Sequence, residues 1–211
     1  MLKILTNNRL FFIFFLVWVL FGAILQLISS PTDLMFLINQ HHSLELDAFF
    51  RFVTTLGEDT IWLILLLALL YRHFVKKVKQ TAIVKFLLIS WILKVLVSLF
   101  LKNIFNHPRP IEVYQNSGRA INLVEGVTLH HWQSFPSGHT TTAFAFACFC
   151  AIVFRKTSLS IILLVMAMLV GFSRMYLFQH FPRDVFAGSI LGVAVVVVMA
   201  KFFYKKEEIS A

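Results

Sequence analysis

Apolar residues fill long stretches of this chain, and polar residues gather in the segments between them. A helix that crosses a bilayer needs roughly 20 mostly apolar residues, and about six stretches reach or approach that length. We predict spans at Leu10–Ile28, Thr60–Phe74, Ala82–Leu101, Gly138–Phe154, Ser158–Phe172 and Val185–Tyr204. The pattern therefore predicts an all-α fold, an integral membrane bundle of about six transmembrane helices.

The segment Asp33–Phe52 has a different pattern, because its apolar and polar residues mix with near-helical spacing. This is typical of an amphipathic helix that lies along a membrane surface. We expect an outer-face interfacial helix there, which could cover the bundle or guide a lipid. The pattern leaves its role open.

The composition favours a single membrane domain. Of the 211 residues, 59% are hydrophobic and 14% are charged, and a soluble domain this apolar could not bury its apolar surface. Residues 1–211 contain no Gly/Ser/Pro-rich linker and no internal repeat, so we expect one membrane-embedded domain. Lys3 and Arg9 precede the first span, which could be a cleaved signal peptide. Its apolar part is long for that, and no small-x-small cleavage site follows, so we expect it to be retained.

The basic residues predict the orientation in the membrane. The formal net charge of +9 could suggest nucleic acid, but the cations sit in short clusters beside the apolar stretches, so we expect no nucleic-acid partner. Short cytoplasmic loops carry excess Lys and Arg. With six spans and cytoplasmic termini, every cluster falls on the cytoplasmic side: Lys3 and Arg9; Arg72, Lys76, Lys77 and Lys79; Arg155 and Lys156; Lys201, Lys205 and Lys206.

Three cations remain on the opposite side, namely Lys102, Arg109 and Arg174. Each alone is typical of a helix-end cation that snorkels to the interface. Other polar residues accompany them, however, in "KNIFNHPRP", in "PSGH" and in "SRMYLFQHFPRD". All three segments lie at membrane edges on the predicted outer face. The topology therefore brings residues that are scattered along the chain to one depth in the bilayer.

This set of residue types suits a phosphate group. Arg and Lys supply the charged donors that a phosphate needs when it leaves water, and Arg can bind it in bidentate fashion. Ser137 adds a hydroxyl donor. Gly138 opens a predicted helix, whose free backbone N–H groups and dipole favour an anion.

The two histidines suggest catalysis. One imidazole can attack phosphorus while the other protonates the departing oxygen and later activates water. Asp184 follows His180 by four residues, so in a helix its carboxylate could hold one ring nitrogen and leave the other free. Pro182 is compatible with a first helical turn. His180 is therefore our candidate nucleophile, and His139 our candidate acid and base.

The three blocks resemble the type 2 phosphatidic acid phosphatase superfamily, which is related to the vanadium haloperoxidases. The family pattern is Lys-x6-Arg-Pro, then Pro-Ser-Gly-His, then Ser-Arg-x5-His-x3-Asp, and residues 102–184 match it without a gap. The resemblance implies a six-helix membrane fold, a phosphohistidine at His180 and no metal or other cofactor. It also assigns the phosphate-binding roles, to Lys102, Arg109, Ser137, Gly138 and Arg174.

Other histidines are weaker candidates for chemistry. The pairs His41/His42 and His130/His131, with Glu125 nearby, could be imagined as metal ligands. Adjacent side chains point apart, however, and no zinc-type spacing is present, so we expect no metal site.

Four further residues need an interpretation. Lys94 falls within the third span, where it is either functional or a snorkelling or helix-paired lysine. His107 lies inside the first motif, and we expect it at the rim of the site. Cys148 and Cys150 lie in an apolar stretch, with a spacing that fits neither zinc nor a redox pair, so we expect them to pack in the core.

The sequence therefore predicts a lipid phosphatase at the outer leaflet of the cytoplasmic membrane, with the bilayer and a lipid phosphate as its partners. A lipid phosphotransferase and a non-catalytic transport or lipid-binding protein remain as alternatives, whereas the spans disfavour a haloperoxidase. Phosphatidic acid, phosphatidylglycerol phosphate, undecaprenyl diphosphate and lipid A phosphates are all candidate substrates. The 24 phenylalanines do not single out a groove for the lipid tail. The oligomeric state stays open.

Overall fold

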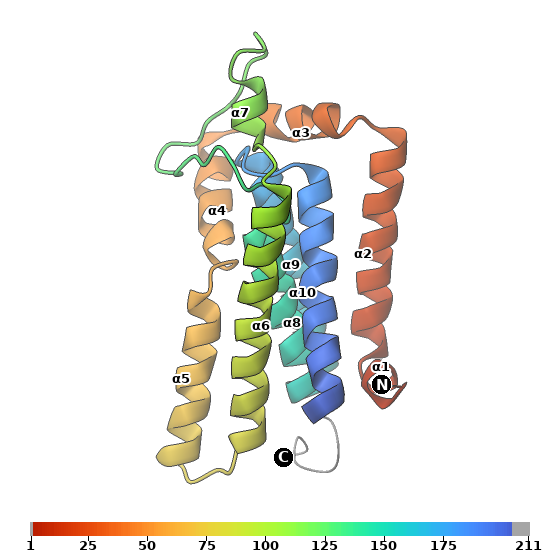
Figure 1. Cartoon of the computed structure of the whole chain (residues 1–211), viewed down its shortest axis with the longest axis vertical. Helices are drawn as coiled ribbons and strands as arrows, with labels where there is room; N and C mark the ends of the chain where they lie inside the picture. The colour runs from red at the N-terminus through yellow and green to blue at the C-terminus, as the bar shows by residue number, and fades with distance from the viewer. Residues whose placement is uncertain (1, 204–211) are drawn as a thin grey trace.

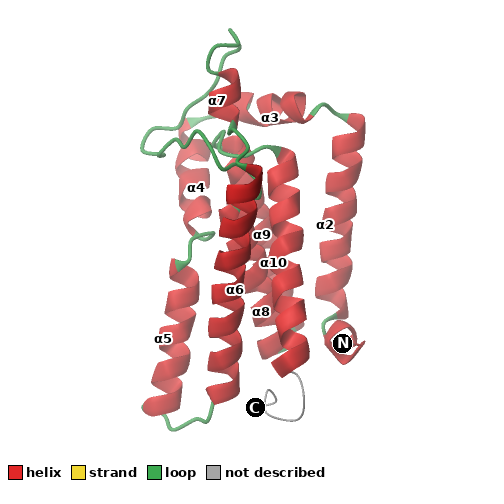
Figure 2. Cartoon of the chain, in the orientation of Figure 1, coloured by secondary structure: helices red, strands yellow, loops and turns green. Residues whose placement is uncertain are grey.

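The computed structural model of the chain describes residues 2–203, and all of the regular structure in that range is helical (Figure 2). The predicted all-α fold is confirmed. The helices are α1 Leu2–Asn7, α2 Arg9–Ile28, α3 Pro31–Gln40, α4 Leu44–Thr55, α5 Thr60–Phe74, α6 Thr81–Phe105, α7 Pro110–Tyr114, α8 Gly138–Phe154, α9 Thr157–Tyr176 and α10 Pro182–Phe203.

The long helices run side by side along the long axis of the molecule (Figure 1). Helices α2, α6, α9 and α10 lie within segments long and apolar enough to cross a membrane, and α4 with α5 makes a fifth span if this bent pair, with 48° between its halves, is counted as one. Helix α8 is apolar but shorter, with 17 residues. The predicted count of six is thus approximate, and the chain is a multi-pass membrane protein. Tyr204, Lys205 and Lys206 lie outside the described residues, as does the side chain of Lys3.

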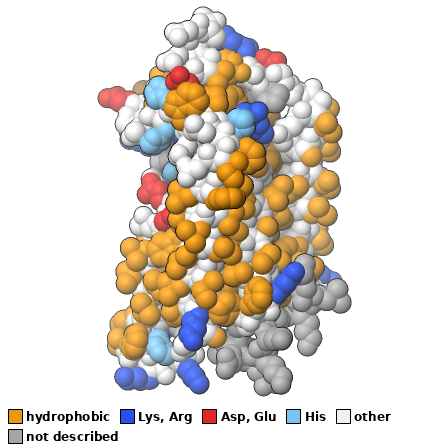
Figure 3. Space-filling model, viewed as in Figure 1, with side chains coloured by type: hydrophobic (Ala, Val, Ile, Leu, Met, Phe, Trp, Pro, Cys, Tyr) orange, Lys and Arg blue, Asp and Glu red, His pale blue; other side chains and the backbone are white. Residues whose placement is uncertain are grey.

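The surface of the bundle is what a lipid environment requires. Large apolar side chains are exposed on the outward faces of α2 and α6, among them Leu16, Val17, Phe21, Leu96 and Phe100. Figure 3 shows apolar side chains covering the length of the bundle, with charged side chains at its two ends. A soluble protein does not expose an apolar surface of this extent, so this belt faces the hydrocarbon of the bilayer.

Helix α8 forms the centre of the bundle, because almost all of its side chains from Thr140 to Val153 are buried. Glycines let α10 pack closely against it. A Cβ atom at Gly188 would lie 2.7 Å from the carbonyl oxygen of Ser137, and one at Gly192 would lie 2.9 Å from the backbone nitrogen of Ala145. Small residues allow helix backbones to approach in this way in membranes. The contact fixes the start of α8 against the first turns of α10.

The segment Asp33–Phe52 forms two helices, not one. Helix α3 lies across one end of the bundle, where α7 also sits, and matches the expected interfacial helix (Figure 1). Helix α4 instead turns along the bundle and forms the first half of the bent pair with α5. The reason is local: Ser43 begins a new helix by accepting a hydrogen bond from the backbone nitrogen of Leu46 (3.3 Å), and α4 buries Phe50 and Val53.

Candidate active site

The predicted site residues come together at the α3 and α7 end of the bundle. A pocket of about 530 Å³ is lined there by Lys102, Arg109, Gly138, His139, Arg174 and His180. Ser137 and Asp184 are fully buried behind this lining. They are joined to each other, since the backbone nitrogen of Ser137 donates to the carbonyl oxygen of Asp184 (3.0 Å). The site residues come from four helices, α6, α8, α9 and α10, and from the loop before α7.

The two arginines are held by neutral oxygens. Arg109 donates from Nε to the carbonyl of Trp132 (3.0 Å) and from Nη1 to Oε1 of Gln179 (3.2 Å). Arg174 donates from Nη1 to the hydroxyl of Thr54 (2.6 Å) and from Nη2 to the same Gln179 oxygen (3.4 Å). These acceptors orient both guanidinium groups without neutralising them. Burial lowers the pKa of Arg109 to about 10, which leaves it charged at neutral pH.

His180 is buried in the turn between α9 and α10, with 1% of its surface exposed. Its Nδ1 lies 3.8 Å from Oδ2 of Asp184. The two predicted partners are therefore close, but this distance is too long for a hydrogen bond. The hydroxyl of Ser134 lies 3.5 Å from the same nitrogen and donates to Asp184 Oδ2 (2.5 Å). Because Nδ1 faces the carboxylate, Nε2 is at the opposite edge of the ring.

The surroundings of His180 keep its ring neutral. Burial, followed by the charges of Arg109, Arg174 and Lys102, lowers the pKa of His180 well below its usual value. A neutral imidazole retains the lone pair that a nucleophile needs. The same cations would attract the phosphate that this lone pair attacks.

Lys102, Gly138 and His139 also line the pocket. A Cβ atom at Gly138 would lie 3.6 Å from Nζ of Lys102, so glycine lets the lysine ammonium approach the start of α8. His139 is the second residue of α8, and Gly57 packs against it from the break between α4 and α5. A Cβ atom at Gly57 would lie 2.8 Å from Cβ of His139.

Two buried residues of the site were not identified from the sequence. Gln179 accepts from both arginines, and its Nε2 donates to the carbonyl of Thr128 (3.3 Å). Ser134 is placed by a backbone hydrogen bond to the carbonyl of His107 (2.9 Å). In the sequence, only their positions could have indicated a role. Gln179 directly precedes His180, and Ser134 stands just before the "PSGH" block. His107 is half-buried beside this loop, where its ring packs on Phe135.

The structure also places the weaker candidates. Across residues 2–203, no group of three or more His, Cys, Asp or Glu side chains is arranged to hold a metal ion. His41 contacts the carbonyl of Leu37, and His131 lies 2.7 Å from Glu112. Cys148 and Cys150 are free thiols buried in the core.

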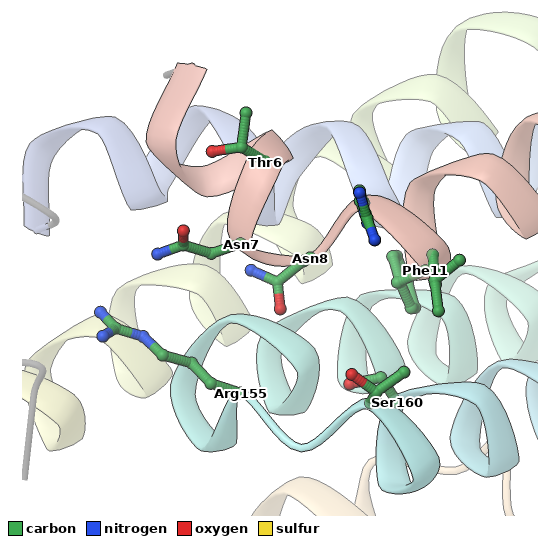
Figure 4. Close-up of a pocket in the computed structure, with 9 residues that line it drawn as sticks. Thr6, Asn7, Asn8, Phe11, Arg155 and Ser160 are labelled. Atoms are coloured by element: carbon green, nitrogen blue, oxygen red, sulfur yellow. The ribbon is translucent and has the colours of Figure 1, made fainter.

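A second polar pocket lies at the opposite end of the bundle, where α1 meets α2 (Figure 4). It has a volume of about 160 Å³ and is lined by residues such as Asn8, Arg155 and Ser160. None of the predicted site residues contributes to its lining. The candidate active site is therefore the larger pocket beneath α3 and α7.

Comparisons with known proteins place the chain in a family. Residues 83–208 match the model of the PAP2 superfamily, and that range includes all three motifs. The lipid A 4'-phosphatase of Bacteroides thetaiotaomicron is 29% identical over 164 residues, which cover 76% of this chain and 71% of that protein. The undecaprenyl-diphosphatase BcrC of Bacillus subtilis is 25% identical, with 77% of each chain covered.

Two crystal structures resemble the fold. LpxE of Aquifex aeolicus superimposes with a TM-score of 0.68 at 32% identity, over 82% of this chain and 96% of LpxE. The PAP2 type phosphatidylglycerolphosphate phosphatase of Bacillus subtilis superimposes with a TM-score of 0.67 at 25% identity, over 95% and 98% of the two chains. Since the family model covers more than half of the sequence, this chain belongs to the PAP2 superfamily.

Proposed function

We propose that this protein is a lipid phosphatase, which hydrolyses a phosphomonoester or diphosphate of a membrane lipid through a phosphohistidine on His180. The observation that carries the proposal is a buried imidazole that shares one pocket with three cations. The similar proteins are phosphatases of lipid A, undecaprenyl diphosphate and phosphatidylglycerolphosphate, which supports a lipid phosphate as substrate.

In the first step, Lys102, Arg109 and Arg174 bind the phosphoryl oxygens, together with the backbone N–H groups at the start of α8. The Nε2 lone pair of His180 forms a bond to phosphorus, and the bond from phosphorus to the lipid oxygen breaks. His139 takes up a proton when the bound phosphate offsets the surrounding cations, and it gives this proton to that oxygen. Asp184 stabilises the positive imidazole through the Nδ1 edge.

In the second step, the neutral His139 takes a proton from water, whose oxygen attacks phosphorus. The bond from phosphorus to nitrogen breaks, and the electron pair returns to His180. Inorganic phosphate leaves, and both histidines regain their starting states. Water and the lipid phosphate are the only reactants, so this cycle requires no metal or other cofactor.

The proposal includes the membrane orientation. The site lies at the end of the bundle opposite the α5–α6 and α8–α9 connections (Figure 1). These connections contain basic residues such as Lys77 and Arg155. If those connections are cytoplasmic, the site meets lipids of the outer leaflet, and both termini are cytoplasmic. We propose that residues 1–211 form this one membrane-embedded domain.

The direct test is release of inorganic phosphate from a panel of purified lipid phosphates in detergent. The wild-type protein should release phosphate, and His180→Ala should not. His73→Ala is the matched control, because His73 lies at the far end of α5, and it should retain activity. Transfer of labelled phosphate to a second lipid without release to water would instead identify a phosphotransferase. A lack of both would contradict an enzymatic role.

A further inference from the structure

A lateral pocket adjoins the proposed phosphate site. It has a volume of about 290 Å³ and lies between α6 and the break that separates α4 from α5. Four residues line both this lateral pocket and the active-site pocket, namely Glu58, Lys102, Gly138 and His139, whereas His180 lines only the latter. The two spaces therefore meet at the proposed proton donor.

The position of the lateral pocket indicates which part of the substrate it would contact, namely the leaving group. In phosphoryl transfer the nucleophile and the leaving oxygen lie roughly in line on opposite sides of phosphorus. His180 attacks from the active-site pocket, and His139 must contact the leaving oxygen in order to protonate it. Because the lateral pocket includes His139 but not His180, the roles proposed for the two histidines put this pocket on the side toward which the lipid alcohol departs.

The lining of the lateral pocket contains a polar group without a hydrogen-bond partner. Ser98 on α6 is 8% exposed, and its hydroxyl oxygen is buried with no hydrogen-bond partner. A buried hydroxyl without a partner costs stability, and a bound polar group would remove that cost. An aliphatic chain in contact with Ser98 would leave the hydroxyl unsatisfied.

The neighbours of Ser98 extend this polar surface. Lys94, one turn below on the same helix, forms an ion pair with Asp59 and donates to the hydroxyl of Thr142 (2.9 Å). Lys94 is therefore a helix-paired lysine, one of the alternatives that the sequence left open. Glu58, from the break between α4 and α5, adds a second carboxylate to the lining. Val95 and Leu99 add apolar side chains, and Leu99 is exposed on the outer face of α6. The pocket thus combines polar groups with an apolar border on α6.

We propose that the lateral pocket binds oxygen atoms of the lipid alcohol, hydroxyl or ester carbonyl groups that lie within a few atoms of the phosphate, with Ser98 as a hydrogen-bond partner. This inference rests on the proposed phosphatase function and specifies its substrate class. The preferred substrates are glycerol- or sugar-based lipid phosphates, rather than phosphates of plain alkyl or polyprenyl alcohols.

A matched pair of substrates tests this proposal. Oleoyl glycerol phosphate has a hydroxyl and an ester near the phosphate, and oleyl phosphate has the same chain without them. The wild-type protein should show a kcat/KM at least about 10-fold higher for the glycerol lipid, and Ser98→Ala should reduce this ratio about 3- to 10-fold. A diacylglucosamine phosphate, measured in parallel, separates recognition of glycerol from recognition of a sugar. Farnesyl phosphate tests a prenyl alcohol.

Ser90→Ala is the matched control. Ser90 lies two turns deeper on α6, and its hydroxyl is also buried and unpartnered. It does not line the lateral pocket, so its removal should leave the ratio unchanged. The ratio is measured within one preparation and does not depend on the folded fraction. Ser98→Cys provides a second variant if Ser98→Ala expresses poorly.

The outcomes separate this inference from the proposed function. Equal kcat/KM for the two oleyl substrates in the wild-type protein, or an unchanged ratio in both Ser98 variants, would overturn the inference and leave the phosphatase proposal intact. A failure to release phosphate from any lipid and from p-nitrophenyl phosphate would overturn both.

Discussion

Ser134 donates a hydrogen bond of 2.5 Å from its hydroxyl to Oδ2 of Asp184, the same oxygen that faces the ring of His180. The backbone nitrogen of Phe181 also donates to this oxygen (3.0 Å). The carboxylate is therefore fixed from two sides before it acts on the imidazole. Partners of this kind orient a catalytic group without touching the substrate.

Ser134→Ala should lower kcat about 10-fold with little change in KM, because the carboxylate loses one of the donors that orient it. Steady-state kinetics on a lipid phosphate would measure both constants. Ser134→Thr keeps the hydroxyl and should recover part of kcat. Ser160→Ala, a buried serine at the far end of α9, is the control. A rise in KM at constant kcat would instead place Ser134 in phosphate binding.

Gln179 should control how tightly the site binds an anion, because one of its oxygens accepts from both Arg109 and Arg174. Gln179→Leu removes this shared acceptor and should weaken inhibition by vanadate about 10-fold. Gln179→Glu keeps an acceptor but places a negative charge between the guanidinium groups. It should therefore weaken inhibition by vanadate more than the leucine variant does. The reverse order would mean that Gln179 fixes geometry alone.

The sequence predicted the all-helical membrane fold and grouped residues that the structure places together, because both depend on local or strongly patterned signals. A stretch such as Leu10–Ile28 has no stable alternative to a membrane helix. The cations Lys102 and Arg174 could be grouped from topology alone, since each stands at a span end on the same predicted side. The structure brings these same residues to one pocket.

The contacts that the sequence did not predict depend on loops and on packing. Gln179 has no periodicity or charge that distinguishes it, and its role appears only when the turn after α9 places it between two arginines. The i, i+4 spacing of His180 and Asp184 suggested a direct hydrogen bond, but His180 precedes the first helical residue, Pro182, so helical geometry does not apply to it. The break between α4 and α5 likewise depends on packing around Gly57.

The buried His180 should make folding stability depend on pH. Its folded pKa lies well below the ordinary value near 6.5, so the folded protein keeps the ring neutral while the unfolded chain binds a proton as the pH falls. This contribution is fully present above the unfolded pKa and is lost below it. By pH 5 the loss should reach up to about 2 kcal/mol.

His180→Gln lacks this titration and should lose less stability than the wild-type protein between pH 7.5 and pH 5. Thermal unfolding in detergent at the two pH values would measure the difference. Parallel decreases in Tm for the two proteins would show that the ring is already protonated, or solvated, in the folded state.

The orientation can be tested with topology reporters. A reporter that is active only outside the cytoplasm should be active when fused after Gln115, which follows α7, and silent when fused after Lys77, in the α5–α6 connection. Fusions in expressing cells, with matched protein levels, provide the measurement. Activity at Lys77 and silence at Gln115 would place the site on the cytoplasmic face.

Replacing the two histidines should affect activity differently, according to the leaving group of the substrate. His180→Ala should abolish turnover and form no acid-labile phosphoenzyme, because the nucleophile is gone. His139→Ala should be nearly inactive on an alkyl lipid phosphate, whose leaving oxygen needs a proton. It should still form phosphoenzyme from an aryl phosphate, whose leaving group departs unaided. Asp184→Asn should fall between them, since the imidazole remains but is poorly oriented.

Rapid-quench labelling of the three variants with a radioactive aryl phosphate is the measurement for this difference. His139 borders both the active-site and the lateral pocket, whereas His180 borders only the first. A group that protonates the departing oxygen must reach the leaving side, and a nucleophile must stand opposite it. Label trapped in His180→Ala but absent from His139→Ala would exchange the two roles and, with them, the side on which the lipid alcohol leaves.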